Sequence, residues 1–282
     1  MQTNNLKKGE NKMGVSASSF RSVENAMSFK PKKASGKNLF FKFGNEEREE
    51  RIVRLVGDFF ITKKHWIGTS RFNDYVLYDD SEFDGEDPLP NQITCNDCDD
   101  DGKAIDGGCP ICKLNAQVRT ILRSKEAEDL DEGAKRDLEN LRKKTIPKTH
   151  CYINVIDRSD PDYAKDGNGY KIADFNKSII TGIGSVVKDV EPDDIAGIDS
   201  GVDIKITKVG NGTEAKYTVS LVLERATVKR TPLTDEEKEW ELHDLKSICG
   251  KKVEPAVLFD RLAEEPKSLL EVGGEDEDGI PF

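Results

Sequence analysis

Four of the six cysteines stand in two C-x-x-C pairs, Cys95/Cys98 and Cys109/Cys112, with ten residues between the pairs. Zinc prefers four ligands at the corners of a tetrahedron, and each short pair presents two thiolates to one ion. The intervening residues include four Asp and three Gly, so this segment has almost nothing apolar to bury and needs a metal in order to fold. The spacing therefore predicts a Zn²⁺ site formed by all four cysteines.

His65 is the alternative fourth ligand, because one His with three Cys makes an equally good zinc set. Spacing alone favours the four cysteines, since both pairs are complete, and His65 would then be an ordinary strand histidine. Cys151 and Cys249 have no C-x-x-C partner and are expected to be small buried residues. No signal peptide is recognisable, so we expect a reducing, cytoplasmic location, which disfavours disulfides.

Basic and aromatic residues lie close to this segment and indicate a second kind of chemistry. In a strand, alternate side chains share a face, so Lys64 and Trp66 point the same way. Lys and Arg neutralise phosphates while rings stack on unpaired bases, which is what a single strand of nucleic acid requires. The alternative for the aromatic residues is a place in the hydrophobic core. The candidate DNA-binding residues are Arg51, Arg54, Lys63, Lys64, Trp66, Arg71, Phe72, Tyr75, Tyr152 and Arg158.

No arrangement of catalytic residues is recognisable, and we expect no enzyme. A phosphate-binding G-x-x-x-x-G-K-[ST] loop is absent, and Gly182-Ile183-Gly184 lacks the third glycine of a dinucleotide fingerprint. The sequence has three histidines, and none of them stands in a recognisable pairing with a nucleophilic Ser or Cys. The acids between positions 79 and 87 could hold Mg²⁺ in a nuclease, but a solvated loop is the simpler interpretation.

Composition and charge set the outer limits. Hydrophobic residues make up 35% of the 282 residues and charged residues 34%, which is typical of a soluble protein with long polar loops. No apolar run is long enough for a membrane span. The net charge of −11 is unevenly distributed: residues 1–71 carry 15 basic and 7 acidic side chains, whereas residues 233–282 carry 6 and 15. The basic N-terminal segment suggests an anionic partner. The acidic C-terminal segment suggests a tail that carries the same sign of charge as that partner.

The elements that position these residues follow from the hydrophobic pattern. Short β-branched and aromatic runs predict strands at 38–43, 51–60, 61–66, 75–78, 151–157, 170–175, 202–209 and 217–223. Apolar residues at helical spacing predict helices after Cys112, around 134–141 and over 176–188. Thr234 followed by Glu237 is a capping box that predicts a helix to about position 248, with a shorter helix at 255–265. The predicted fold is mainly β with helices (α+β): a compact β-barrel with an inserted metal-binding, helical subdomain.

The same patterns divide the chain into segments. We expect a basic flexible N-terminal arm at 1–36, a DNA-binding core at 37–232 with the zinc-binding and helical insertion at 79–146, a C-terminal helical region at 233–272 and an acidic tail at 273–282.

The basic strand with His65-Trp66, the insertion ending in Cys-Pro-Ile-Cys and the run HCYINVIDR from His150 to Arg158 resemble phage single-stranded DNA-binding proteins of the T-even helix-destabilising type. The resemblance covers residues 37–232. It implies a zinc-bearing subdomain inserted in an OB-type barrel, with DNA in a cleft between them. It also implies a zinc set of one His and three Cys, here His65, Cys98, Cys109 and Cys112. The spacing of the cysteines favours Cys95 as the fourth ligand in place of His65. The basic N-terminal arm of that family supports cooperative self-association on DNA, and Lys7-Lys8 with Ser16–Ser19 matches it loosely.

The ending EDEDGIPF is similar to the acidic tip of bacterial single-stranded DNA-binding proteins. In that family the terminal Pro-Phe and its carboxylate dock into pockets on replication and repair enzymes. The resemblance implies protein-interaction roles for Asp276, Glu277, Asp278, Ile280, Pro281 and Phe282.

Together these patterns predict a sequence-independent single-stranded DNA-binding protein, encoded by a phage and acting in the host cytoplasm. It would coat DNA in replication, recombination and repair, and recruit partner enzymes through its tail. The alternative is a zinc-ribbon adaptor of transcription or replication machinery. A metal-dependent nuclease is the more distant alternative.

Overall fold

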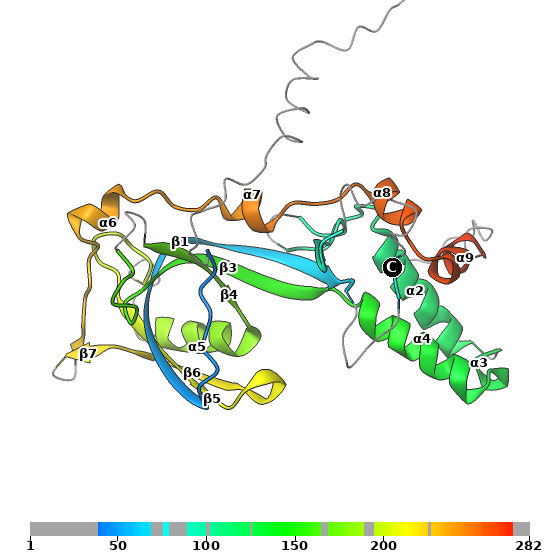
Figure 1. Cartoon of the computed structure of the whole chain (residues 1–282), viewed down its shortest axis with the longest axis horizontal. Coiled ribbons are helices and arrows are strands. Elements are labelled where there is room, and N and C mark those ends of the chain that lie inside the picture. Colours follow the sequence, from blue (N-terminus) through cyan, green and yellow to red (C-terminus); the bar gives the residue numbers. More distant parts are fainter. Residues whose placement is uncertain are drawn as a thin grey trace, which may run out of the picture. The chain divides into compact units, whose positions relative to one another are not determined.

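The computed structural model describes residues 39–68, 76–78, 89–99, 102–124, 126–164, 169–188, 195–224 and 227–272. The fold is a mixed α/β arrangement around an antiparallel sheet with strand order β4-β3-β1-β5-β6, and β2 pairs with the far end of β1 (Figure 1). The strands are β1 (Arg48–Trp66), β2 (Gln92–Thr94), β3 (Lys148–Asp157), β4 (Tyr170–Phe175), β5 (Asp203–Val209) and β6 (Lys216–Leu221), with a separate hairpin of β7 (Leu223–Glu224) and β8 (Thr227–Val228).

The α+β class was predicted correctly, but in the described ranges the sheet does not close into a barrel. Strands β4 and β6 are its two ends, and a helix packs against β6. The helices are α2 (Pro110–Arg123), α3 (Glu126–Asp129), α4 (Glu132–Thr145), α5 (Lys177–Val187), α6 (Asp235–Glu239), α7 (Leu245–Cys249), α8 (Pro255–Asp260) and α9 (Glu264–Val272), with a 3₁₀ turn at Gly212–Glu214. No helix in these ranges is long and apolar enough to cross a lipid bilayer.

Strand β1 is the longest element of the sheet, at 19 residues, and replaces the two strands predicted at 51–60 and 61–66. Its pairing with β3 shifts register between Val56 and Phe60, where Gly57 takes a φ of +75°. Such a bulge bends a strand without ending it, and glycine adopts positive φ at little cost. Because β1 continues through the bulge, one strand pairs with β5 at its start and with β2 at its end.

One face of the sheet builds the larger hydrophobic core. Val53 and Leu55 of β1 lie there with Ile153 and Val155 of β3, and α5 contributes Ile179. Each fully buried aliphatic side chain of this kind contributes about 1.5–3 kcal/mol to stability. The helix predicted at 176–188 is confirmed, and Asn176 caps it by accepting a hydrogen bond from the Ile179 backbone N–H.

A second core surrounds the cysteine segment. Leu114 and Val118 of α2 are buried, as the helical spacing predicted, and they pack with Leu141 of α4 and Leu258 of α8. The sequence did not predict that α8 and α9 would join this core, since the C-terminal region has no obvious partner in the pattern. The C-terminal segment therefore helps to hold the cysteine segment in place.

The capping box is present, but the long helix predicted after it is not. Glu237 accepts a hydrogen bond from the Thr234 backbone N–H at 2.9 Å, and Thr234 Oγ1 accepts one from the Glu237 N–H at 3.2 Å. Helix α6 then ends at Trp240, whose indole packs edge-on against Tyr163 and Tyr170. Burying this ring offsets the loss of further helical turns, so α7 starts afresh after Asp244.

Glu237 also forms the main buried ion pair of this region. Its carboxylate accepts hydrogen bonds from the Arg158 guanidinium and from the Tyr163 hydroxyl, the latter at 3.1 Å. Burial alone would raise the pKa of Glu237, but the hydrogen bonds from Arg158 and from the Thr234 backbone outweigh it and lower that pKa.

We predict that Glu237→Ala lowers the free energy of unfolding by about 3 kcal/mol, because it removes the hydrogen-bonded partner of the Arg158 charge and leaves only the Asp203 carboxylate, 3.8 Å away. Urea unfolding followed by circular dichroism at pH 7 measures the change. Glu236→Ala, at the exposed neighbouring position, is the matched control and should stay within about 0.5 kcal/mol of the wild type. Equal losses in both variants would contradict the role given to the ion pair.

Candidate metal centre and adjoining cationic pocket

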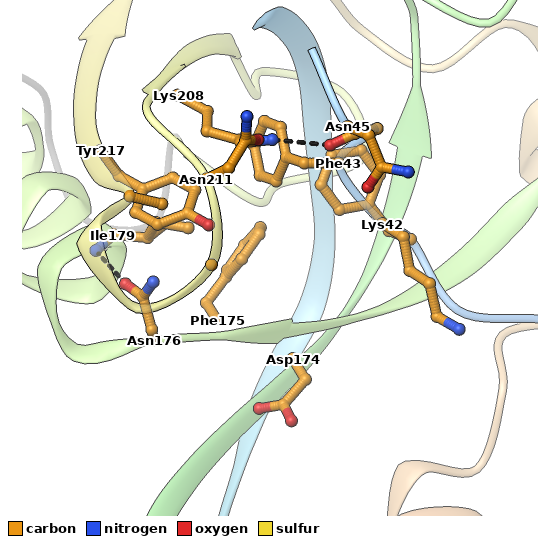
Figure 2. Close-up of a pocket in the computed structure, with 14 residues that line it drawn as sticks. Lys42, Phe43, Asn45, Asp174, Phe175, Asn176, Ile179, Lys208, Asn211 and Tyr217 are labelled. Atoms are coloured by element: carbon orange, nitrogen blue, oxygen red, sulfur yellow. Dashed lines mark hydrogen bonds between the residues drawn. The ribbon is translucent and has the colours of Figure 1, made fainter. Parts of the chain in front are cut away.

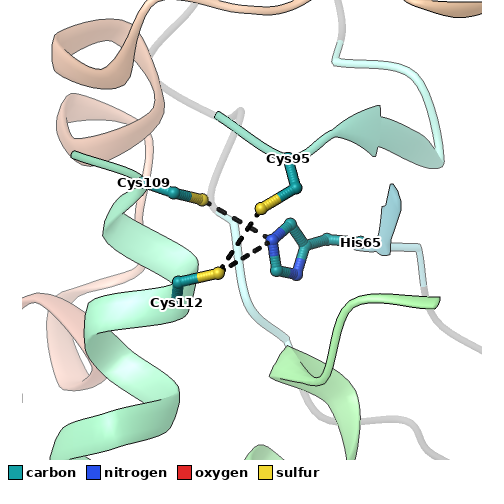
Figure 3. A group of neighbouring side chains, drawn as sticks. All are labelled: His65, Cys95, Cys109 and Cys112. Atoms are coloured by element: carbon teal, nitrogen blue, oxygen red, sulfur yellow. Dashed lines mark hydrogen bonds between the residues drawn. The ribbon is translucent and has the colours of Figure 1, made fainter. Parts of the chain in front are cut away.

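His65, Cys95, Cys109 and Cys112 gather their ligand atoms into one group, all within 4.8 Å of one another (Figure 3). The His65 Nε2 atom lies 3.5 Å from the Cys109 sulfur and 3.6 Å from the Cys112 sulfur. The Cys95 and Cys112 sulfurs are 3.4 Å apart. Two ligand atoms about 2.3 Å from one tetrahedral ion would lie about 3.8 Å apart, so the spacing suits a single ion.

Three separate elements deliver these ligands. His65 is the penultimate residue of β1, and its backbone pairs with Ile93 of β2, two residues before Cys95. Cys109 is the N-cap residue of α2, and Cys112 lies in its first turn. The helix N-terminus carries partial positive charge, which stabilises thiolates at these two positions.

The ring of His65 is oriented by a contact with α4. Its Nδ1 atom lies 3.0 Å from the Thr145 carbonyl oxygen. A carbonyl oxygen only accepts hydrogen bonds, so Nδ1 carries the proton and Nε2 is left with its lone pair toward the sulfurs. The contact therefore selects the tautomer that a metal needs.

Cys98 lies outside this group, which differs from the set that spacing favoured and from the set that the resemblance implied. The Cys98 thiol donates to the Cys95 carbonyl oxygen at 3.0 Å and lies 3.7 Å from Thr62 Oγ1. Its own carbonyl oxygen accepts a hydrogen bond from Lys252. The sequence could not show this exchange of Cys98 for His65, because it depends on the long-range pairing of β1 with β2.

The acidic, glycine-rich segment between the cysteine pairs has a structural role. The Asp97 carboxylate accepts hydrogen bonds from the backbone N–H of Gly107 at 3.1 Å and of Cys109 at 2.8 Å. A Cβ atom on Gly107 would lie 1.9 Å from the Asn96 carbonyl oxygen, so no other residue fits there. These contacts close the loop and bring Cys109 to Cys95.

The electrostatics of the group suit a bound cation. Hydrogen bonds from the Cys112 and Cys95 thiols lower the pKa of Cys109 well below its usual value. The resulting thiolate raises the pKa of Cys95 to about 12 and raises that of Cys112 further. Their proximity and burial therefore disfavour three thiolates together in the absence of a counter-charge. Three thiolates at this separation need a dication, and the donor set fits Zn²⁺.

Three arginines predicted to contact DNA are bound within the protein instead. Arg54 is fully buried and donates to the carbonyl oxygens of Ile195, at 2.7 Å, and of Gly197. Arg158 forms the ion pair with Glu237 already described. Arg51 is half-buried, with ion pairs to Glu49 and Asp157 at 2.6 and 3.3 Å. Arg54 therefore has no exposed surface for a phosphate, whereas Arg158 keeps 17% of its side chain exposed, and DNA contact by these residues stays a prediction.

Tyr152 and Lys64 contact each other rather than open surface. The Tyr152 ring is buried between Phe60 and His150, with interplanar angles of 24° and 11°. The Lys64 ammonium lies 4.9 Å from its centroid, and burial lowers the pKa of Lys64. Trp66 remains 40% exposed. Arg71, Phe72 and Tyr75 lie outside the described residues, as do the N-terminal arm and the tail residues from Asp276 to Phe282.

A cationic pocket adjoins the metal group and includes arginines that the sequence analysis did not single out. This cavity of about 610 Å³ lies between the end of β1, α2 and α4. Its basic residues are Lys63, Arg119, Arg123 and Arg142, its one acid is Glu139, and its remaining lining is Asn115, Leu122, Ile146 and Pro147. Arg119 and Arg123 are four residues apart on α2, a spacing that places both on one face of the helix and was visible in the sequence.

The single acid of this pocket is already engaged. Glu139 accepts hydrogen bonds from Arg142 at 3.0 and 2.9 Å. Within the described ranges no carboxylate forms an ion pair with Lys63, Arg119 or Arg123. The pocket therefore has excess positive charge over a partly apolar floor, and Ile146 is 42% exposed there.

No known protein family matches the chain, and no curated protein is significantly similar to it.

We predict that Cys98→Ser retains one Zn²⁺ per chain, whereas His65→Ala, Cys95→Ser and Cys109→Ser each release it or weaken it strongly. The reason is that only the last three remove a member of the ligand group. Colorimetric zinc release after mild oxidation measures stoichiometry, and the visible spectrum of the Co²⁺-substituted protein reports the number of thiolates. Loss of metal from Cys98→Ser with retention in His65→Ala would show that the four-cysteine set is the true one.

We also predict that chelation of the metal loosens the second core before the sheet. Three sulfur ligands, of which Cys95 and Cys109 are buried, lose their counter-charge, while the sheet core has its own aliphatic contacts. Hydrogen–deuterium exchange with and without a chelator should show faster exchange in α2 and β2, with β3 and β5 still protected. Uniform acceleration across all four elements would contradict this order.

Proposed function

We propose that this chain is a non-catalytic, Zn²⁺-containing protein that binds single-stranded DNA without sequence specificity. The observation that carries the proposal is the cationic pocket: four basic side chains converge on it, and its one acid is paired. Phosphate neutralisation by such residues supplies most of the affinity in sequence-independent binding.

The metal group explains how the basic residues are held together. Lys63 lies two residues before His65 on β1, and Arg119 lies two turns beyond Cys112 on α2. An ion shared by His65 and Cys112 fixes the distance between these elements. Its four protein ligands leave no open coordination position, so its role is structural and no reaction step is assigned to it.

Single-stranded DNA is favoured over duplex by the surroundings of the pocket. The pocket is concave, and its apolar floor at Leu122, Ile146 and Pro147 can contact sugars and bases that a duplex keeps inside. The antiparallel path β4-β3-β1-β5-β6 of the described sheet, with α5 between β4 and β5 in the chain, supports a partly open barrel of OB type, a fold that commonly binds oligonucleotides. The resemblance to phage single-stranded DNA-binding proteins agrees with both the single-strand preference and the OB-type sheet.

The remaining parts of the proposal rest on the sequence. The acidic tip with Ile280, Pro281 and Phe282 would recruit replication, recombination and repair enzymes, and the basic N-terminal arm would promote cooperative self-association on DNA. A phage origin and action in the host bacterial cytoplasm are proposed from the resemblance of residues 37–232 to the phage proteins.

The test is a charge reversal in the pocket. We predict that Arg119→Glu with Arg123→Glu weakens binding to fluorescent oligo(dT) and flattens the salt dependence, since each lost phosphate contact reduces the log–log slope by about 0.7. Anisotropy titrations across a salt series measure both, with a duplex of equal length as comparator.

The matched control reverses two exposed charges elsewhere, Arg136→Glu with Lys251→Glu, and should bind nearly as the wild type does. Equal effects of the two double variants, or equal wild-type affinity for duplex and single strand, would contradict the proposal. Failure of the wild type to bind any oligonucleotide would favour the zinc-ribbon adaptor.

A further inference from the structure

A second cavity, of about 660 Å³, lies at the end of β4. It is bordered by the segment from Phe41 to Asn45, the start of α5 and the turn between β5 and β6 (Figure 2). Four aromatic rings form its apolar part: Phe41, Phe43, Phe175 and Tyr217. Amide side chains lie around it, from Asn45, Asn176 and Asn211, and we call it the amide-rimmed pocket.

Two of the four rings have surface available to a ligand. Phe41 and Phe175 are buried and belong to the main core, whereas Phe43 and Tyr217 are only half-buried. The Phe43 and Tyr217 centroids are 5.4 Å apart with planes tilted by 57°, so the rings meet at an angle rather than stack. Their exposed parts are available to contact a planar group.

The hydrogen-bonding character of Asn176 is fixed by the helix that it caps. Its Oδ1 accepts from the Ile179 backbone N–H at 3.1 Å and from the Ser178 hydroxyl at 2.7 Å. Because both partners donate, the acceptor must be the oxygen, and the Nδ2 group is left as a donor. Figure 2 shows the oxygen turned to the helix and the nitrogen turned away from it.

The charged residues of this pocket also favour a ligand that accepts hydrogen bonds. Lys42 is exposed at the rim, while Lys208 is buried and donates to the Gly44 carbonyl oxygen at 2.6 Å. The one carboxylate in the lining, Asp174, lies 2.7 Å from His150 Nδ1. Lys42 and the Asn176 Nδ2 group are therefore donors at this pocket, and its one carboxylate is paired with His150.

The amide-rimmed pocket is connected to the cationic pocket through the sheet. Phe175 pairs with Cys151 of β3, and Cys151 pairs with Ile61 of β1, so the three side chains share one face. Lys63 lies two residues further along that face and lines the cationic pocket. The step from Phe175 to Ile61 spans two strand spacings, about 10 Å, which a few nucleotides can cover.

We propose that the amide-rimmed pocket takes one unpaired base of the bound strand and prefers a base with carbonyl oxygens at its edge, such as thymine or guanine, over adenine. The base stacks on Tyr217, Phe43 contacts its edge, and Asn176 Nδ2 donates to its carbonyl oxygen. The inference rests on the proposed function and adds one base-selective position to an otherwise unspecific footprint.

The experiment uses oligomers of fixed length and phosphate number that are abasic except for one central base. Adding thymine should strengthen wild-type binding about 5- to 150-fold over the fully abasic strand, the range of one base–aromatic stack. Tyr217→Leu should abolish this gain, and Tyr217→Phe, which restores the ring, should retain it. Unfolding midpoints of the variants show whether each one is folded.

Base preference is tested separately with Asn176→Ser. Serine keeps the capping oxygen but lacks the amide donor. The wild type should bind the thymine strand about 2- to 10-fold more tightly than the adenine strand, the range of one hydrogen bond, and the variant should bind both equally. A preference that survives in Asn176→Ser would overturn the role of the amide.

A covalent readout does not depend on affinity. A strand carrying 5-iodouracil as its one base should crosslink on irradiation to Tyr217 or Phe43, identified by mass spectrometry. Crosslinks confined to other residues, or equal binding of thymine and abasic strands, would overturn this inference and leave the proposed function intact. Loss of all oligonucleotide binding would overturn both.

If a free EDEDGIPF peptide binds the wild type but not Tyr217→Leu, and oligomers bind both alike, the pocket binds peptides and the inference is overturned.

Discussion

The hydrogen bond from His65 Nδ1–H to the Thr145 carbonyl oxygen is the constraint on which the cysteine segment depends. It joins β1 to the end of α4 and selects the imidazole tautomer whose Nε2 faces the sulfurs. With that ring fixed, an ion can tie β1, the end of β2 and the start of α2 to one point. Lys63 on β1 and Arg119 and Arg123 on α2 line the cationic pocket, so these two elements carry both candidate metal ligands and basic side chains.

Local chemistry was largely predictable from the sequence, and long-range pairing was not. Helical spacing identified the buried stripe of α2, and the capping box at Thr234 is present as expected. The zinc set differs by one ligand because C-x-x-C spacing describes only neighbours along the chain. His65 reaches the group through the β1–β2 ladder, which no local pattern encodes.

Charged residues were the least predictable part of the candidate site. Arg54 and Arg158 lie on a strand or at its end, and their sequence neighbours suggested open surface. Their carbonyl and carboxylate partners come from positions more than 70 residues away. Arg119 and Arg123 were not predicted to bind a ligand, because the apolar stripe of α2 indicated a packing surface. A helix can pack along one face and present cations on another, and both patterns were legible.

The bulge of β1 has a consequence for how this strand can vary. Between Val56 and Phe60, β1 contains three residues where β3 contains one, so β1 has two extra residues, an even number. Side chains alternate with a period of two, and the outer half of β1 therefore stays in phase with its inner half. Loss or gain of a single residue at this point would rotate His65 to the opposite side of the ribbon, away from the sulfurs. Evolution can thus lengthen or shorten this kink only in pairs of residues.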